Sequence, residues 1–438
     1  MEPMERRRLL SGVTLITHGQ GGHANDSELK LAANLIARRA GTAAQYVMTV
    51  NDDGPIGAKV ASFTLDPGSA SMNDVSSGET IIRLDWSDVK TAPTTTIADA
   101  VAGYMLKHHL VEQQLHLLGP SRGASIMSNL AGALGRSGVW VDHVTYVDPV
   151  PVTINIPGIG EVADGPMRVT ENVVYADDYW RSDNNITTGF DGQPVRGAYN
   201  VELTMVQQEN AGDPHVGAGA YYVATIDPNE PIVSPAMSSW YQGTKQRPAR
   251  DQTGYRFSRI VGGGRSRAGT SKAFDGVARR DAVKERGSQW PNIDAVKVVG
   301  SRRQFSVGDR FNVSFRFNDS DSDSNVTLLI DNDRNPYNNW AATIARRSFG
   351  ANAMPTVNRV GVKTGTLDVG TYFIAARIKD SAGHVRYAYS PYSIELVSAS
   401  APMSRSLFTH PNPIESKPVT RLVDVFRDQT DPRQDQLW

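Results

Sequence analysis

The chain of 438 residues contains no cysteine. That absence excludes disulfides, cysteine-ligated zinc sites, iron–sulfur clusters and thiol nucleophiles. The sequence also lacks any run of about 18 apolar residues, the length that a spanning helix needs, so we expect no transmembrane segment. The chain also lacks an excess of charge of one sign, because its 45 Lys and Arg residues are balanced by 46 Asp and Glu residues. We therefore expect no nucleic-acid partner, since nucleic acids select basic surfaces.

The pattern of apolar runs divides the chain into five segments. Residues 1–11 are expected to form a leader or arm, and residues 12–240 the larger domain. A basic, glycine-rich linker is expected over 241–289, a β-sandwich over 290–398 and a poorly ordered tail over 399–438. The first segment lacks the apolar core of a secretory signal. It resembles the short Arg-rich leader, ending in Leu-Leu-Ser, of some bacterial cell-surface proteins, which implies an extracellular or cell-surface protein.

The larger domain alternates β-branched runs with stretches of helical periodicity. The expected strands are Val13–Thr17, Ala44–Val50, Lys59–Leu65, Thr80–Trp86, Gln114–Leu118, Val141–Val147 and Asn172–Tyr175. The expected helices are Ser27–Ala40, Ile97–Leu110 and Ser125–Leu134. Strands separated by helices predict an α/β domain around a mostly parallel sheet.

The strongest local pattern is Gly119-Pro-Ser-Arg-Gly123, which fits the spacing G-x-S-x-G between an expected strand and an expected helix. In this pattern the serine occupies a strained turn that projects its hydroxyl group. The small flanking residues let strand and helix approach closely, and the helix N-terminus offers N–H groups to a developing oxyanion. The pattern predicts that Ser121 is a nucleophile.

A second glycine-rich loop, His18-Gly-Gln-Gly-Gly22, follows the first expected strand. In serine hydrolases a His-Gly loop at this place supplies an oxyanion donor from the backbone N–H of the next residue, here Gln20. The backbone N–H of Arg122 would supply the other donor. The alternative interpretation is a turn that only closes the strand. Phosphate binding is disfavoured, because the spacings G-x-x-x-x-G-K-[ST] and G-x-G-x-x-G are both absent.

His215 is the candidate general base. It lies well downstream of Ser121 in an expected loop, and this architecture places nucleophile, acid and histidine in that order along the chain. Two strand ends compete for the acid: Asp148 ends one expected strand, and Asp177 or Asp178 ends the next. A carboxylate at either place can orient the imidazole and stabilise the imidazolium. We favour Asp148 and keep Asp177 as the rival.

Three runs, Ile81–Trp86, Leu115–Ala124 and Val144–Pro149, resemble segments of lipases in the α/β-hydrolase superfamily. Pancreatic-type lipases show a strand ending in Asp-Trp, a G-x-S-x-G elbow and a Leu-Asp-Pro segment whose aspartate is the triad acid. The resemblance implies that role for Asp148. The later blocks Asn172–Trp180 and His215–Asp227 are similar to a bacterial lipase-like branch.

The resemblance implies a serine esterase or lipase that acts through an acyl-enzyme. The sequence departs from the family pattern at Pro120, where His is commonest, and the absence of a long apolar lid favours an esterase over a true lipase. The expected substrate is a small-molecule or lipid ester, and no cofactor is expected. The competing hypothesis is a non-catalytic cell-surface binding protein, with the first domain as scaffold and the sandwich as interaction module. The oligomeric state stays open.

The C-terminal half carries short strand-like runs separated by turn signals, which predict an immunoglobulin-like sandwich. The runs are Arg310–Phe317, Val326–Ile330, Val360–Lys363, Thr371–Ile378 and Ser393–Val397. Oxygen ligands cluster at Asn318–Asn325 and Asp331–Asp333, where a structural calcium site competes with a solvated acidic loop as the interpretation. The run lacks the glycine and glutamate of an EF-hand, which favours the loop. We expect residues from Trp290 onward to be dispensable for activity on small esters.

The predicted fold class is therefore α/β: an α/β-hydrolase fold with a mostly parallel central sheet, followed by a smaller all-β immunoglobulin-like sandwich. Function resides in the site and not in the fold, so the test of the hydrolase hypothesis is whether Ser121, His215 and a strand-end acid come together.

Overall fold

The computed structural model describes most of the two expected domains. The described residues are 12–54, 56–156, 158, 160–181, 192–203, 214–226, 254–257, 280–284, 287–351 and 357–398. The expected leader (1–11), the expected tail (399–438) and most of the expected linker (241–289) lie outside these ranges. Among the described helices, none combines the length and the apolar character that crossing a membrane requires.

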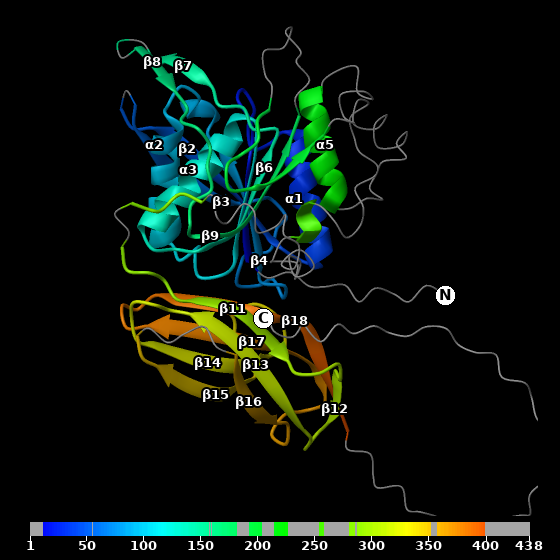
Figure 1. Cartoon of the computed structure of the whole chain (residues 1–438). Coiled ribbons are helices and arrows are strands. Elements are labelled where there is room, and N and C mark those ends of the chain that lie inside the picture. Colours follow the sequence, from blue (N-terminus) through cyan, green and yellow to red (C-terminus); the bar gives the residue numbers. More distant parts are fainter. Residues whose placement is uncertain are drawn as a thin grey trace, which may run out of the picture.

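An eight-stranded sheet forms the centre of the N-terminal half (Figure 1). Its strands lie in the order β10-β9-β6-β5-β1-β4-β2-β3, and only the β2–β3 pair at one edge is antiparallel. The strands are β1 (Gly12–Thr17), β2 (Ala44–Asp52), β3 (Ala58–Leu65), β4 (Glu79–Asp85), β5 (Leu115–Pro120), β6 (Val141–Val147), β9 (Val173–Trp180) and β10 (Tyr199–Glu202). Because the strands from β10 to β2 are parallel, their C-terminal ends meet at one edge, where loops gather.

Helices cover both faces of this sheet, as Figure 1 shows. Helices α2 (Thr94–Lys107) and α3 (Arg122–Arg136) pack on one face, and α1 (Ser27–Ala40) and α5 (Pro214–Ile226) pack on the other. Leu117 of β5 belongs to the first hydrophobic core and Leu118 to the second, as expected for a strand buried on both faces. Two short 3-10 helices are η1 (Ser87–Val89) and η2 (Gly254–Phe257).

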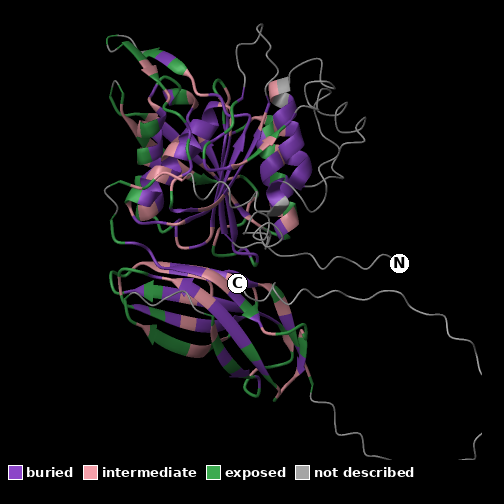
Figure 2. Ribbon diagram, in the orientation of Figure 1, coloured by how far each residue is buried: buried purple, intermediate pink, exposed green. Residues whose placement is uncertain are grey.

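The C-terminal half consists of a three-stranded and a five-stranded sheet around one hydrophobic core. The strands are β11 (Asn292–Val298), β12 (Gln304–Ser306), β13 (Arg310–Asn318), β14 (Ser324–Asp331), β15 (Ala342–Phe349), β16 (Asn358–Lys363), β17 (Gly370–Asp380) and β18 (Val385–Val397). Figure 2 shows buried and exposed residues alternating along them, whereas the central strands of the N-terminal sheet are buried throughout. Alternation is typical of sheets with one face on a core and one face in water.

A buried ion pair joins the two halves. The guanidinium of Arg386 on β18 lies 2.7 Å from the carboxylate of Asp142 on β6, and each side chain is 1% exposed. The same Arg386 donates to the carbonyls of Val111 and Trp140. The Asp142 carboxylate also accepts the backbone N–H of Leu115, the first residue of β5. The C-terminal half is thus anchored at the start of β5 and β6, which argues against the expectation that it is dispensable.

The predicted fold class is wrong for this chain. Strands dominate the described residues: 18 strands stand beside four α-helices, and they lie in four sheets. Seven of the fourteen strand pairings are antiparallel. The prediction extended the strand–helix alternation over the whole larger domain. That alternation stops after α3, because the chain goes from β6 through the antiparallel hairpin of β7 (Thr153–Ile156) and β8 (Gly160–Ala163) to β9.

Candidate active site

Ser121 lies in a strained turn between β5 and α3. Its φ of 53° and ψ of −131° place a non-glycine residue in a region that costs about 1–3 kcal/mol. Only two other non-glycine residues in the described ranges have positive φ, His109 and Asp148. The turn depends on close packing, since a Cβ on Gly123 would lie 2.5 Å from the carbonyl oxygen of His18. This is the geometry that the G-x-S-x-G spacing predicted.

Asp148 follows β6 directly and is 1% exposed. Its φ of 43° is the second strained value at this edge of the sheet. One carboxylate oxygen, Oδ2, lies 2.7 Å from Nε of Arg181, and the other, Oδ1, accepts the backbone N–H of Arg181 at 3.1 Å. This ion pair compensates the burial of the carboxylate, and it keeps the aspartate in one orientation.

His215 is the residue that the structure brings to Asp148. Its Nδ1 lies 2.5 Å from Oδ2 of Asp148, and its side chain is 30% exposed. The sequence placed His215 in a loop, whereas the structure places it at the second residue of α5. The histidine is therefore held on a helix that packs against the sheet, with one imidazole nitrogen on the buried carboxylate.

The rival acid Asp177 has different partners. Its Oδ1 lies 2.8 Å from Nε2 of His143 and accepts the hydroxyl of Thr145 at 2.7 Å, while Oδ2 accepts the hydroxyl of Tyr179 at 2.8 Å. All four side chains are buried between the sheet and α5. The neighbouring Asp178 accepts the N–H of Val195, and burial raises its pKa well above the usual value for an aspartate. This geometry favours Asp148 over Asp177 as the partner of His215.

The glycine-rich loop after β1 lies against Ser121. A Cβ built on Gly19 would lie 3.0 Å from Cβ and 3.5 Å from Oγ of Ser121, so only glycine fits without a shift. Gln20 is the next residue, and Arg122 follows Ser121 as the first residue of α3. The first N–H groups of a helix have no intrahelical acceptor. One predicted oxyanion donor thus follows the glycine packed against Ser121, and the other follows Ser121 itself.

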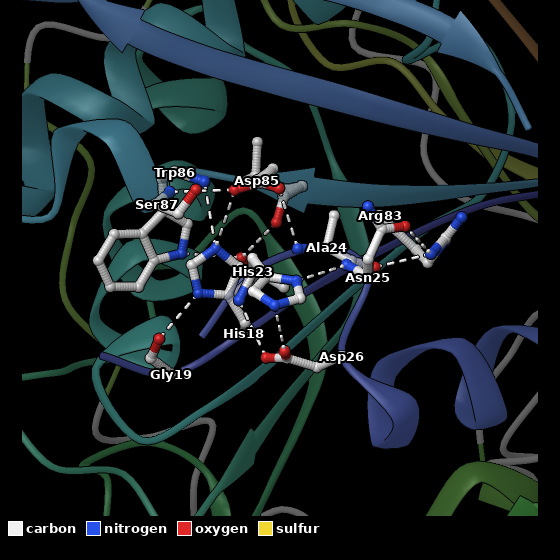
Figure 3. Close-up of polar contacts among 12 residues, drawn as sticks. His18, Gly19, His23, Ala24, Asn25, Asp26, Arg83, Asp85, Trp86 and Ser87 are labelled. Atoms are coloured by element: carbon white, nitrogen blue, oxygen red, sulfur yellow. Dashed lines mark hydrogen bonds and ion pairs between the residues drawn. The ribbon is translucent and has the colours of Figure 1, made fainter. Parts of the chain in front are cut away.

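His18 is fixed at the base of this loop, as Figure 3 shows. His18 is 3% exposed, and its ring stacks on Trp86, with centroids 4.6 Å apart. The nearby Asp85 accepts the backbone N–H groups of Ala24 and Ser87. Burial would raise the pKa of Asp85, but hydrogen bonds from His18, Ser87 and Ala24 outweigh it and hold that pKa well below the usual range.

The sequence analysis missed three contacts at the candidate site: the ion pair of Arg181 with Asp148, the contacts of the His18 ring, and those of the Arg122 side chain. Arg181 directly follows β9 in the sequence, shortly after the candidate acids Asp177 and Asp178. A basic residue at such a strand end was the signal that could have indicated an ion pair with a strand-end carboxylate. The Arg122 guanidinium, with its side chain fully buried, lies 2.8 Å from the carboxylate of Asp164, just beyond the β7–β8 hairpin.

The acidic run of the C-terminal half uses its carboxylates inside the fold. Asp321 accepts the N–H of Gln289, Asp323 accepts the N–H of Ala351, and Asp319 accepts the hydroxyl of Ser322. Within the described residues, no group of three or more His, Asp or Glu is arranged to hold a metal ion. These contacts favour a structural role for the loop.

Comparisons with known proteins assign no family. No protein-family model matches the chain, and no curated protein matches significantly. Among solved structures, the product of the gene lin2722 from Listeria innocua is 17% identical with a TM-score of 0.24, and the match covers 31% of this chain and 51% of that one. This chain thus spans about half the length of that protein.

Two further solved structures are similar to smaller parts of the chain. The cupredoxin domain of amoB from Nitrosocaldus yellowstonii is 14% identical, with a TM-score of 0.17 over 28% of this chain and 97% of that one. The periplasmic chaperone SfaE is 10% identical, with a TM-score of 0.18 over 25% of this chain and 61% of that one. Scores this low carry no argument about fold or function, so the site rests on its own geometry.

Proposed function

We propose that this protein is a serine carboxylic-ester hydrolase that works through an acyl-enzyme. The observation that carries the proposal is that Ser121 and the Asp148–His215 pair lie at the same edge of the sheet. Two of these residues hold strained backbone conformations at the ends of neighbouring strands, and the third lies 2.5 Å from the buried carboxylate. Strain of this kind persists where the surrounding structure enforces it, and it concentrates at active sites.

In the first half of the reaction, Ser121 Oγ attacks the ester carbonyl carbon and His215 Nε2 accepts the hydroxyl proton. Asp148 accepts the Nδ1–H of the imidazole, which fixes the tautomer and stabilises the imidazolium. The carbonyl oxygen becomes an oxyanion, and the backbone N–H groups of Gln20 and Arg122 stabilise it. Losing one such donor typically costs about 2.7–4 kcal/mol of transition-state stabilisation.

In the second half, the imidazolium returns its proton to the alcohol as the ester C–O bond breaks, leaving Ser121 acylated. A water molecule then attacks the acyl-enzyme while His215 accepts its proton. The tetrahedral intermediate collapses, Ser121 regains its proton, and the carboxylic acid leaves. The same two backbone donors stabilise the oxyanion in both halves, so their alignment affects both barriers.

The test is a panel of p-nitrophenyl esters from acetate to decanoate, assayed with wild type and with Ser121→Ala. We expect wild-type turnover and a loss on the order of 10⁶ in kcat for the variant, since removing the nucleophile of a triad has about that effect. Labelling by a fluorophosphonate probe should disappear in parallel. A folded Ser121→Ala protein with wild-type turnover would contradict the proposal, and so would the absence of turnover and labelling in wild type.

A further inference from the structure

The peptide unit between Gly19 and Gln20 is held from two directions. On one side, the Gly19 carbonyl lies 2.8 Å from Nδ1 of His18 and also accepts the N–H of Gly22 at 3.2 Å. On the other side, Oε1 of Gln20 accepts a hydrogen bond of 3.0 Å from Nη1 of Arg122. The two contacts bracket the backbone N–H that the proposed reaction uses as an oxyanion donor.

Both ring nitrogens of His18 make polar contacts. Nδ1 faces the Gly19 carbonyl oxygen, and Nε2 lies 3.1 Å from the backbone N of Trp86 and 3.6 Å from Oδ1 of Asp85. Because a carbonyl oxygen only accepts, Nδ1 is the donor in the contact with Gly19. The described peptide bonds are all trans, so the N–H of Gln20 points opposite to the Gly19 carbonyl that His18 holds. His18 thereby sets the direction of this N–H, and Figure 3 shows its contact with Gly19.

The Arg122 guanidinium uses all five of its N–H donors. Nε and Nη2 donate to the two carboxylate oxygens of Asp164, at 2.8 and 3.1 Å. Nη2 also donates to the carbonyl of Ala92, and Nη1 donates to Gln20 Oε1 and to the carbonyl of Lys90. Lysine offers only three donors from a single atom and cannot reproduce this planar arrangement. A fully satisfied buried guanidinium is a rigid support for the Gln20 side chain.

We propose that His18 and Arg122 are positioning residues, a role that rests on the proposed ester hydrolysis. The His18 imidazole fixes the carbonyl side of the Gly19–Gln20 peptide and the Arg122 guanidinium fixes the Gln20 side chain. Together they keep the Gln20 N–H aligned with the oxyanion before substrate arrives. Because a displacement of about 1 Å at a reacting group can cost about 100-fold in rate, the support affects kcat more than substrate binding.

The experiment measures kcat and KM on p-nitrophenyl butyrate, and affinity for a trifluoromethyl ketone, whose adduct carries an oxyanion. For Arg122→Lys we expect kcat to fall about 10- to 100-fold with KM changed less than about threefold. His18→Leu should show the same split. His18→Asn should recover most of kcat, because its side-chain amide can donate from nearly the place of Nδ1. The ketone affinity should fall in proportion to kcat/KM across the series.

Arg334→Lys is the matched control. Arg334 is a buried arginine that donates to the carbonyl of Ser390 in the C-terminal half. Its replacement carries a similar structural cost and should leave kcat unchanged. Wild-type kcat in both Arg122→Lys and His18→Leu, with Ser121-dependent turnover intact, would overturn the positioning role alone. A similar loss in Arg334→Lys, or no rescue by His18→Asn over His18→Leu, would also overturn it. Absence of Ser121-dependent turnover in wild type would overturn the proposed function as well.

Discussion

The ion pair between Arg386 and Asp142 offers the sharpest test of how the two halves depend on each other. We consider Arg386→Met, which keeps the length of the side chain and removes its charge. The variant leaves the Asp142 carboxylate buried with the N–H of Leu115 as its remaining hydrogen-bond donor among the described contacts. It also removes the donor to the carbonyls of Val111 and Trp140.

The expected loss of stability follows from the burial of both partners. Each side chain is 1% exposed, so neither solvent nor salt screens the charge that stays behind. Removing one partner of such a pair typically costs about 3–5 kcal/mol, most of it from the uncompensated charge. Adding Asp142→Asn to the variant removes that charge. The double variant is therefore expected to recover about half of the loss.

The assay is urea unfolding followed by tryptophan fluorescence, for wild type, the single variant and the double variant at pH 7.5. A penalty below about 1 kcal/mol at pH 7.5 would refute the reasoning. So would a double variant that is less stable than the single one, because the loss would then not come from a stranded charge.

Two further predictions concern carboxyl groups at other places in the sheet. Asp148→Asn should lower kcat about 10⁴-fold on p-nitrophenyl butyrate, whereas Asp177→Asn should cost far less, and the opposite ranking in folded variants would move the acid to Asp177. Burial raises the pKa of Glu79 from 4.5 to about 8, so the folded chain keeps a proton that the unfolded chain releases near pH 4.5. Wild-type stability should then fall between about pH 5 and about pH 8, and the Tm of Glu79→Gln should rise relative to wild type over that range; parallel Tm curves would contradict this.

The elements that sequence reasoning placed well are those with strong local signals. The helix expected at Ser27–Ala40 has these bounds in the structure, and the strand expected at Val141–Val147 does too. The turn at Ser121 was readable because its conformation demands small neighbours on both sides, which leaves a pattern in the sequence. A local backbone conformation of this kind requires particular residue types at a fixed spacing, so it can be predicted from the sequence.

Contacts between residues far apart in the sequence had no comparable sequence pattern that would predict them. Arg181 meets Asp148 from 33 positions away, and Arg386 meets Asp142 from 244 positions away. Such pairs depend on strand order and register, which single-sequence patterns do not determine. The hairpin of β7 and β8 was missed because its residues carry no alternation long enough to indicate strands. The fold class was wrong for the same reason. The prediction extended the strand–helix alternation beyond β6, where the chain instead forms the β7–β8 hairpin.

The strained residues of the site are held by the sheet itself. Ser121 donates its backbone N–H to the carbonyl of Val147, at 2.9 Å, and Asp148 donates its own to the carbonyl of Tyr179, at 2.7 Å. Each residue thus keeps a strand-like hydrogen bond to the next strand while its φ turns positive. The ladder from β5 through β6 to β9 can therefore stabilise both turns without any substrate. Arg386 and Asp142 hold the opposite ends of β5 and β6. Removing their ion pair should therefore increase the mobility of both turns, at Ser121 and at Asp148.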